Sequence, residues 1–172
     1  MSSLLQVDGL SKSYGRQVGC DDVGLELHAG EVLGIVGESG SGKTTLLRCL
    51  AGHLAADSGT VSYSMRDGAF RDTLVMDEAE RRHLMRTDWA FVHQNPRDGL
   101  RMSISAGGNI GERLMAVGNR HYGNIRETAA KWLERVEIDP ARIDNRPSTF
   151  SGGMQQRLQI ARNLVTAPRL VF

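Results

Sequence analysis

Residues 37–45 read GESGSGKTT, and this stretch decides how the rest of the sequence is interpreted. It fits a phosphate-binding pattern in which a glycine and four free positions precede Gly-Lys-Ser/Thr. Its glycines permit backbone conformations that a Cβ forbids, so consecutive N–H groups can turn inward around a phosphate. Lys43 can reach the β- and γ-phosphates, and the Thr44 hydroxyl can bind Mg²⁺. The expected nucleotide-binding residues, called the phosphate loop below, are Gly37, Glu38, Ser39, Gly40, Ser41, Gly42, Lys43, Thr44 and Thr45.

The segments on either side of the phosphate loop support this interpretation. Residues 31–36, EVLGIV, form a short apolar run that predicts a buried strand. Thr45 and the following LLRCLAG predict a helix whose N-terminal dipole attracts a phosphate. A chance glycine-rich turn is the alternative interpretation, and the order strand, loop, helix argues against it.

Composition narrows the class of protein. A chain of 172 residues with 40% hydrophobic content is long enough for one globular domain with a core. Its net charge of +1 gives no field that would hold a polyanion, so we expect no nucleic-acid partner. There is no apolar run of about 20 residues and no signal-peptide pattern, so we expect a cytoplasmic chain without direct membrane insertion. Cys20 and Cys49 lack metal-ligand spacing, and we expect no chemistry from them.

An antiparallel β layer is predicted around the phosphate loop. Residues 4–10 and 18–27 read as two strands joined by a turn at Gly15, and residues 60–65 read as a third strand. Residues 66–76 are predicted as a loop and residues 77–86 as a helix. Tyr14 stands between the first two strands and has two interpretations, stacking on a purine or a structural role. Its spacing alone favours the structural role.

The second half of the chain is predicted to hold a strand, a helical insert and a second anion site. The apolar strand 89–93 ends at Gln94, and ligands of open α/β sheets bind at such strand ends. Apolar positions spaced three and four apart predict helices over 105–117 and 125–136. Ser151 is the expected N-cap of a helix over 152–165, opened by Ser-Gly-Gly. A further strand begins at 169–172.

Taken in this order, the phosphate loop, Gln94 and FSGGMQQR at 150–157 resemble the ATP-binding subunits of the ABC family over the whole chain. The resemblance implies an α/β P-loop NTPase core in one partial domain, 1–172, with a β layer and phosphate-loop strand and helix in 4–65, a helical insert in 96–150, and a signature helix with the start of a strand in 151–172. It implies ATP and Mg²⁺ as cofactors. Tyr14 would stack on adenine, and Gln94 would contact Mg²⁺ and the attacking water. Ser151, Gly152 and Gly153 would close on the γ-phosphate held by a second subunit of a dimer.

Three longer segments, 86–101, 105–126 and 150–165, resemble more closely the ATP-binding subunits of the bacterial carbon–phosphorus lyase system. That branch implies an ATPase that docks on a soluble lyase core and serves phosphonate breakdown. Met154 stands where the family has glutamine, a variant similar to the peptide and phosphonate branches. The ATPase of a peptide- or nickel-type importer and a non-hydrolysing ATP-dependent scaffold remain alternatives. A GTPase or kinase is disfavoured because Asn-Lys-x-Asp is absent.

The sequence also departs from the family pattern. The family's Asp-Glu pair, which follows the signature helix and serves Mg²⁺ and the attacking water, is not present, and none of the five histidines can be assigned as the family's switch histidine. We therefore expect an N-terminal fragment that stops before these carboxylates. ATP hydrolysis is expected of the full-length protein, whereas the 172-residue chain is expected to be inactive and poorly soluble.

Overall fold

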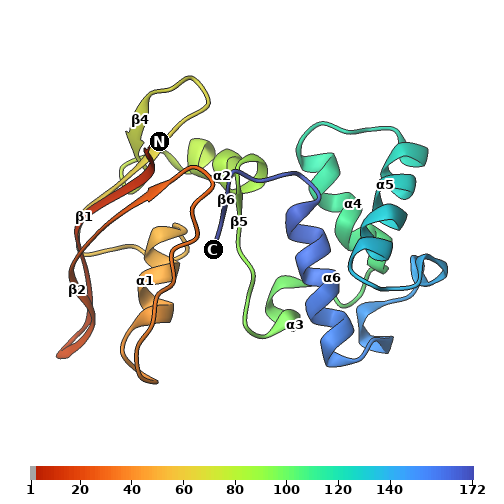
Figure 1. Ribbon diagram of the computed structural model, residues 1–172, viewed down its shortest axis with the longest axis horizontal. Helices are drawn as coiled ribbons and strands as arrows, with labels where there is room; N and C mark the ends of the chain where they lie inside the picture. Colours follow the sequence, from red (N-terminus) through yellow and green to blue (C-terminus); the bar gives the residue numbers. More distant parts are fainter. Residues whose placement is uncertain (1–2) are drawn as a thin grey trace. The chain divides into compact units, whose positions relative to one another are not determined.

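The computed structural model describes residues 3–172 and is shown in Figure 1. The chain divides into two compact units, Met1–Arg82 and His83–Phe172. Each unit is described by itself below.

The first unit is built on a four-stranded antiparallel sheet with the order β2-β1-β3-β4. Its strands are β1 (Ser3–Tyr14), β2 (Gln17–His28), β3 (Ser58–Ser64) and β4 (Phe70–Asp72). Gly15 has φ 61° in the turn between β1 and β2, which forms the long hairpin in Figure 1. The predicted β layer is confirmed, with longer strands than the apolar patterns indicated. The predicted loop over 66–76 is wrong in part, because Phe70–Asp72 pairs with β3.

Two helices complete this unit, α1 (Lys43–Leu50) and α2 (Glu78–Thr87). The first unit ends at Arg82, so the last turn of α2 lies in the second unit. Helix α1 packs on β1 and β2. Its apolar face is buried through Leu46, Cys49 and Leu50, and the sheet contributes buried Leu10 and Val61. Helix α2 carries acidic residues in its first turn and Arg86 in its last, as the sequence predicted.

The strand predicted at residues 31–36 is not formed. The segment has no regular structure, and the side chains of Val32 and Val36 are 95% and 91% exposed. A strand exists only where a neighbouring strand accepts its backbone hydrogen bonds, and no strand of residues 3–172 pairs with this segment. The apolar composition of EVLGIV indicates a tendency to be buried, but it does not supply the partner.

The second unit contains a short parallel strand pair. Strand β5 (Trp89–Ala90) pairs with β6 (Leu170–Val171). Bonds from the Val92 N–H to the Phe172 carbonyl and from the Phe172 N–H to the Ala90 carbonyl extend the pairing. The predicted strand over 89–93 is therefore present but shorter, and its parallel partner is the strand expected at the end of the chain.

Helices make up the rest of the second unit. They are α3 (Pro96–Gly99), α4 (Ala106–Ala116), α5 (Tyr122–Arg135) and α6 (Gly152–Leu164), with two 3₁₀ turns at Pro140–Arg142 and Pro147–Thr149. Helices α4, α5 and α6 pack against one another around a core that includes Ile110, Leu133 and Leu158. The helices predicted over 105–117, 125–136 and 152–165 are confirmed within a few residues, whereas α3 was not predicted. No helix within residues 3–172 is both long and apolar enough to cross a membrane.

Candidate functional site: the phosphate loop and the N-terminus of the signature helix

The phosphate loop depends on two glycines in the left-handed region. Gly40 has φ 84° and Gly42, the N-cap of α1, has φ 90°. Gly42 also lies against β2, because a Cβ at this position would be 1.7 Å from the main-chain oxygen of Gly19. Only glycine meets both the torsion angle and this close approach. The phosphate loop is thus held directly on the backbone of β2.

The ammonium group of Lys43 lies within the phosphate loop. Its Nζ donates to the carbonyl oxygens of Gly37 at 2.8 Å and Glu38 at 2.5 Å, and it lies 3.3 Å from the Ser41 hydroxyl. These partners are exposed, so water or an anion can replace them at small cost. The loop therefore carries its positive charge at the position where the pattern requires a contact with phosphate.

The first turn of α1 supplies further donors. The Leu46 N–H bonds to the Gly42 carbonyl at 2.9 Å, and this is the first bond of the helix. The N–H groups of Lys43, Thr44 and Thr45 come before it and have no acceptor within the helix. Together with the helix dipole, they form a site that attracts an anion. The Thr44 side chain is exposed at this end, and its role as a ligand for Mg²⁺ stays a prediction.

Tyr14 lies next to this site. It is the last residue of β1, and its side chain is 51% exposed. A Cβ on Gly19 would be 3.2 Å from the Tyr14 ring and 2.8 Å from the Thr45 methyl group. The absence of a side chain at Gly19 therefore lets the ring and the start of α1 approach the same point of β2. Adenine stacking by Tyr14 stays a prediction, but the ring is within reach of the phosphate loop.

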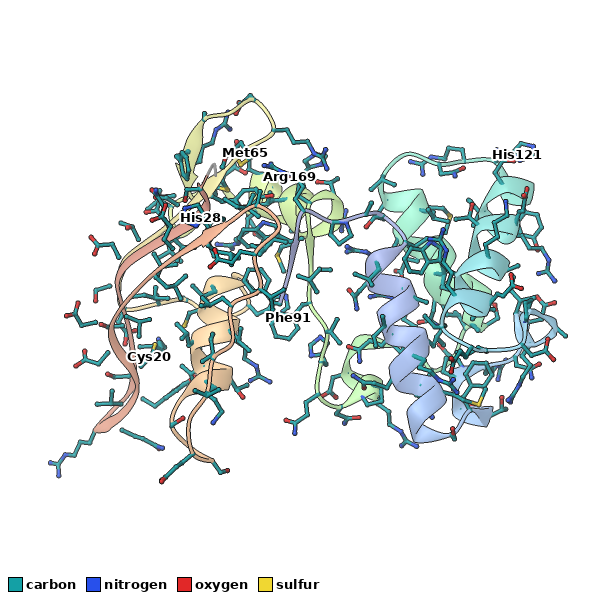
Figure 2. The ribbon with its side chains drawn as sticks, in the orientation of Figure 1. Cys20, His28, Met65, Phe91, His121 and Arg169 are labelled. Atoms are coloured by element: carbon teal, nitrogen blue, oxygen red, sulfur yellow. The ribbon has the colours of Figure 1, made fainter. Side chains whose placement is uncertain are left out.

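Sequence reasoning missed Gly19, although a glycine inside an alternating strand is a known signal for close backbone approach. The register of β1 and β2 is also irregular here, because it shifts between Lys12 and Ser13. Cys20, labelled in Figure 2, follows Gly19 on β2. The irregular strand and the missing side chain together make room for α1.

A charged pair fixes the end of β1 that carries Tyr14. Lys12 Nζ donates to Asp57 at 2.7 Å, and the second carboxylate oxygen accepts the Ser13 N–H at 2.7 Å. The hydrogen bond from Lys12 is the largest cause that lowers the pKa of Asp57, and the same contact raises the pKa of Lys12. Both groups are therefore charged at neutral pH, and they join β1 to the segment that leads into β3.

The buried thiol of Cys49 shows why no chemistry is expected from it. Its side chain is 0% exposed on α1, and burial raises its pKa to about 11. The thiol is thus protonated at neutral pH, and a protonated thiol is a poor nucleophile.

In the second unit, the N-terminus of α6 is open. Ser151 is its N-cap, and the Ser151 hydroxyl accepts the Met154 N–H at 3.3 Å, which confirms the predicted cap. Gly152 and Gly153 are exposed, and a Cβ at either would meet no atom of the described chain within 4 Å. Residues 151–153 are called the signature segment below. An anionic group can therefore reach the free N–H groups of this helix.

Gln94 is exposed and follows the extension of β5. The next residue, Asn95, caps α3 by accepting the Arg97 N–H at 3.2 Å. The structure thus brings Tyr14 to the phosphate loop in the first unit, and it places Gln94 and the signature segment in the second. Within residues 3–172 no group of three or more acidic, histidine or cysteine side chains could hold a metal ion.

The oxygens of Thr44 and Gln94 nevertheless suit Mg²⁺. This ion keeps several waters and takes phosphate oxygens together with only one or two protein groups. Both side chains are exposed and end in an oxygen donor.

Comparison with known proteins places these features in one family. The family model described as ABC transporter matches residues 20–172. The phosphonate utilization ATP-binding protein PhnK of Escherichia coli K12 is 60% identical over 169 residues, which cover 98% of this chain and 65% of that protein. A peptide import ATP-binding protein of Brucella ovis is 35% identical, with 98% of this chain and 52% of that protein covered. The chain thus spans about half to two thirds of the length of these relatives.

Solved structures agree with this assignment. The ATP-binding cassette MJ0796, in a dimeric post-hydrolysis state bound to ADP and Pi, matches with a TM-score of 0.86 and 26% identity. The match covers 98% of this chain and 72% of that chain. A second dimeric structure of MJ0796 matches with a TM-score of 0.85 and 27% identity.

Proposed function

The chain belongs to the ABC transporter family, and on that premise we propose that it is the nucleotide-binding part of an ATP-hydrolysing subunit that serves phosphonate utilisation. The identity of 60% to the phosphonate utilization protein, against 35% to a peptide import protein, favours the phosphonate branch. The single structural observation that supports nucleotide binding most strongly is the position of Lys43 Nζ inside the phosphate loop, at the N-terminus of α1.

Each residue of the phosphate loop region has a proposed role. The loop N–H groups and Lys43 would hold the β- and γ-phosphates, and Thr44 would bind Mg²⁺. Tyr14 would stack on the adenine ring. Gln94 would contact Mg²⁺ and orient the attacking water, and it is proposed as a catalytic residue together with Ser151 and Gly153. These roles follow the family pattern, and the exposure of Thr44, Tyr14 and Gln94 supports them.

The signature segment is proposed to act on a second subunit's nucleotide. Ser151 and Gly153 would offer the helix dipole and N–H groups of α6 to a γ-phosphate held by the partner. The open N-terminus of α6 supports this role, and so do the dimeric structures of MJ0796. The working unit would be a homodimer or a pair with another ABC subunit.

The partner is proposed to be a soluble phosphonate lyase core, with the ATPase located in the cytoplasm, where ATP is available. A peptide-type importer ATPase, which would dock on a membrane permease, is the alternative. The two proposals share the nucleotide site and differ in the surface of residues 102–126, which includes α4. A non-hydrolysing scaffold is the second alternative.

Two linked measurements test the proposal. The first is growth on an alkylphosphonate as sole phosphorus source, in a strain that lacks PhnK and carries the full-length protein. We expect growth with the wild type and none with Lys43→Ala. The second is phosphate release by the purified full-length protein. If the strain grows but the subunit releases no phosphate, either alone or with its partners, the non-hydrolysing scaffold is favoured. If the subunit releases phosphate but the strain does not grow, another transport or metabolic system is favoured.

A further inference from the structure

Gln159 is a buried polar residue on α6 that holds the main chain next to Gln94. Its side chain is 0% exposed. Its Oε1 accepts the His93 N–H at 2.5 Å, and its Nε2 donates to the His93 carbonyl at 3.0 Å. One carboxamide thus binds both main-chain polar groups of the residue that precedes Gln94.

Gln159 is packed against α3 and against a second polar residue of α6. A Cβ on Gly99, in α3, would lie 2.5 Å from Gln159 Oε1, so a side chain at position 99 would require the amide to shift. Helix α3 packs directly on α6, and the two lie side by side in Figure 1. One turn further along α6, the Asn163 side chain donates to the main-chain carbonyl of Gln159 at 3.0 Å. The amide is therefore enclosed by a short helix that begins directly after Gln94 and Asn95.

A carboxamide at this position costs free energy that an apolar side chain would not. Burial of an amide is unfavourable unless its donor and acceptor groups are hydrogen-bonded. The neighbouring Leu158 and Ala161 on α6 are apolar and fully buried. The two hydrogen bonds give a defined position of the His93 main chain relative to α6, which apolar packing does not give.

The same helix carries the signature segment. Gln159 is eight residues from Ser151, which corresponds to about 12 Å along a helix that rises about 1.5 Å per residue. The helix is continuous from Gly152 to Leu164. A displacement of its N-terminus is therefore passed to residue 159 as a rigid-body movement, and from there to the main chain of His93.

We propose that Gln159 is a positioning residue, which fixes the main chain of His93 on α6 so that Gln94 moves together with the signature segment. The proposal rests on the proposed function for the roles of Gln94 and Ser151. It needs no contact between Gln159 and nucleotide. Phe91, labelled in Figure 2, lies two residues before His93 on the chain that Gln159 holds.

Gln159→Met tests this proposal, because methionine has a similar length and cannot replace the two hydrogen bonds. Gln155→Met is the matched control. Gln155 is also buried on α6, but its amide donates to the carbonyls of Pro147 and Phe150 instead. A general loss of stability in α6 should appear in both variants, whereas a loss of control over Gln94 should appear only in Gln159→Met.

The first readout is a double-mutant cycle in the full-length protein. We expect Gln159→Met to lower kcat for phosphate release by about 10- to 100-fold and to leave the Kd for ATP within about threefold. In the Gln94→Ala background the same substitution should change kcat by less than about threefold, because its effect acts through Gln94. The fold-changes in kcat caused by Gln155→Met and by Gln94→Ala should instead multiply when the two substitutions are combined. Two results would overturn the proposal: fold-changes in kcat from Gln159→Met and Gln94→Ala that multiply fully in the double variant, or a kcat that Gln159→Met alone leaves unchanged.

The second readout does not need activity. The His93 amide should exchange with deuterium at least about tenfold faster in Gln159→Met than in the wild type, and it should be unaffected in Gln155→Met. Equal exchange in all three proteins would overturn the proposal. If the wild type releases no phosphate while the His93 amide depends on Gln159, the proposed ATPase function fails and the positioning of the main chain stands.

Discussion

Gly42→Ala, compared with Gly40→Ala, tests the contact between the phosphate loop and β2. The two glycines have nearly the same torsion angle, with φ 90° and 84°. Their surroundings differ, because a Cβ on Gly40 would meet no atom of the described chain within 4 Å, whereas a Cβ on Gly42 would be 1.7 Å from the Gly19 oxygen. Gly40→Ala therefore reports backbone strain alone.

The expected magnitudes follow from this difference. A residue with a Cβ in the left-handed region costs about 1–2 kcal/mol, so Gly40→Ala should lower the free energy of unfolding by about that amount. Gly42→Ala adds an overlap with a main-chain atom, which cannot be relieved by a rotamer change. Overpacking of this kind costs a further ~1–3 kcal/mol, so the total should be about 2–5 kcal/mol. Since β2 and α1 must separate, ATP affinity should also fall by at least about tenfold.

The assay is urea unfolding of both variants, together with a calorimetric titration with Mg-ATP, in the full-length protein. Gly15→Ala is a further control, since Gly15 has φ 61° at the hairpin turn and a Cβ there would meet no atom of the described chain within 4 Å. If Gly42→Ala destabilises the protein no more than Gly40→Ala does, then β2 does not support the phosphate loop and the reasoning is refuted.

Three further predictions concern other parts of the molecule. Tyr14→Ala should weaken binding of ATP by about 5- to 150-fold, from ~1–3 kcal/mol of stacking, and Tyr14→Trp should preserve it; equal losses in the two variants would make Tyr14 structural. Ser151→Arg should leave ATP affinity within a few-fold but prevent nucleotide-dependent dimerisation and phosphate release, and normal release would remove the role of the signature segment. The raised pKa of Cys49, about 11 against an ordinary 9.0, means that the folded state keeps a proton that the unfolded state loses. The contribution of the Cys49 thiol to the free energy of unfolding should therefore be fully present below pH 9 and be lost as the pH rises through 11. Urea unfolding of Cys49→Ala should not show this pH-dependent loss, and the same loss in Cys49→Ala would contradict the assignment to Cys49.

Local signals in the sequence identified much of the site. The glycine spacing of residues 37–45 predicted a loop that requires left-handed backbone, and Gly40 and Gly42 have that conformation. Ser151 before Gly-Gly predicted the N-cap that its hydroxyl forms. Such features depend on residues within a few positions of one another, so a sequence reveals them directly.

Features that depend on distant partners were missed. The segment 31–36 is apolar enough for a buried strand, yet it lies exposed because no strand of the described chain accepts its hydrogen bonds. Gly19 and Gln159 gain their roles from α1 and from His93, which lie far from them in sequence. No periodicity within a window of residues reports such contacts.

Hydrogen–deuterium exchange with and without Mg-ATP tests the central claim, that residues 37–45 bind the phosphates of ATP, most directly. In the full-length protein, Mg-ATP should slow exchange of the amides in 37–46 by at least about tenfold, because the N–H groups that surround the phosphate become hydrogen-bonded. Peptides from α5, which carries no residue proposed to bind nucleotide, should not change in the monomer. Lys43→Ala should abolish the protection at ATP concentrations that saturate the wild type, since a charge-assisted contact worth ~1.5–3 kcal/mol is lost. Unchanged exchange in 37–46 of the wild type at saturating Mg-ATP would contradict the account.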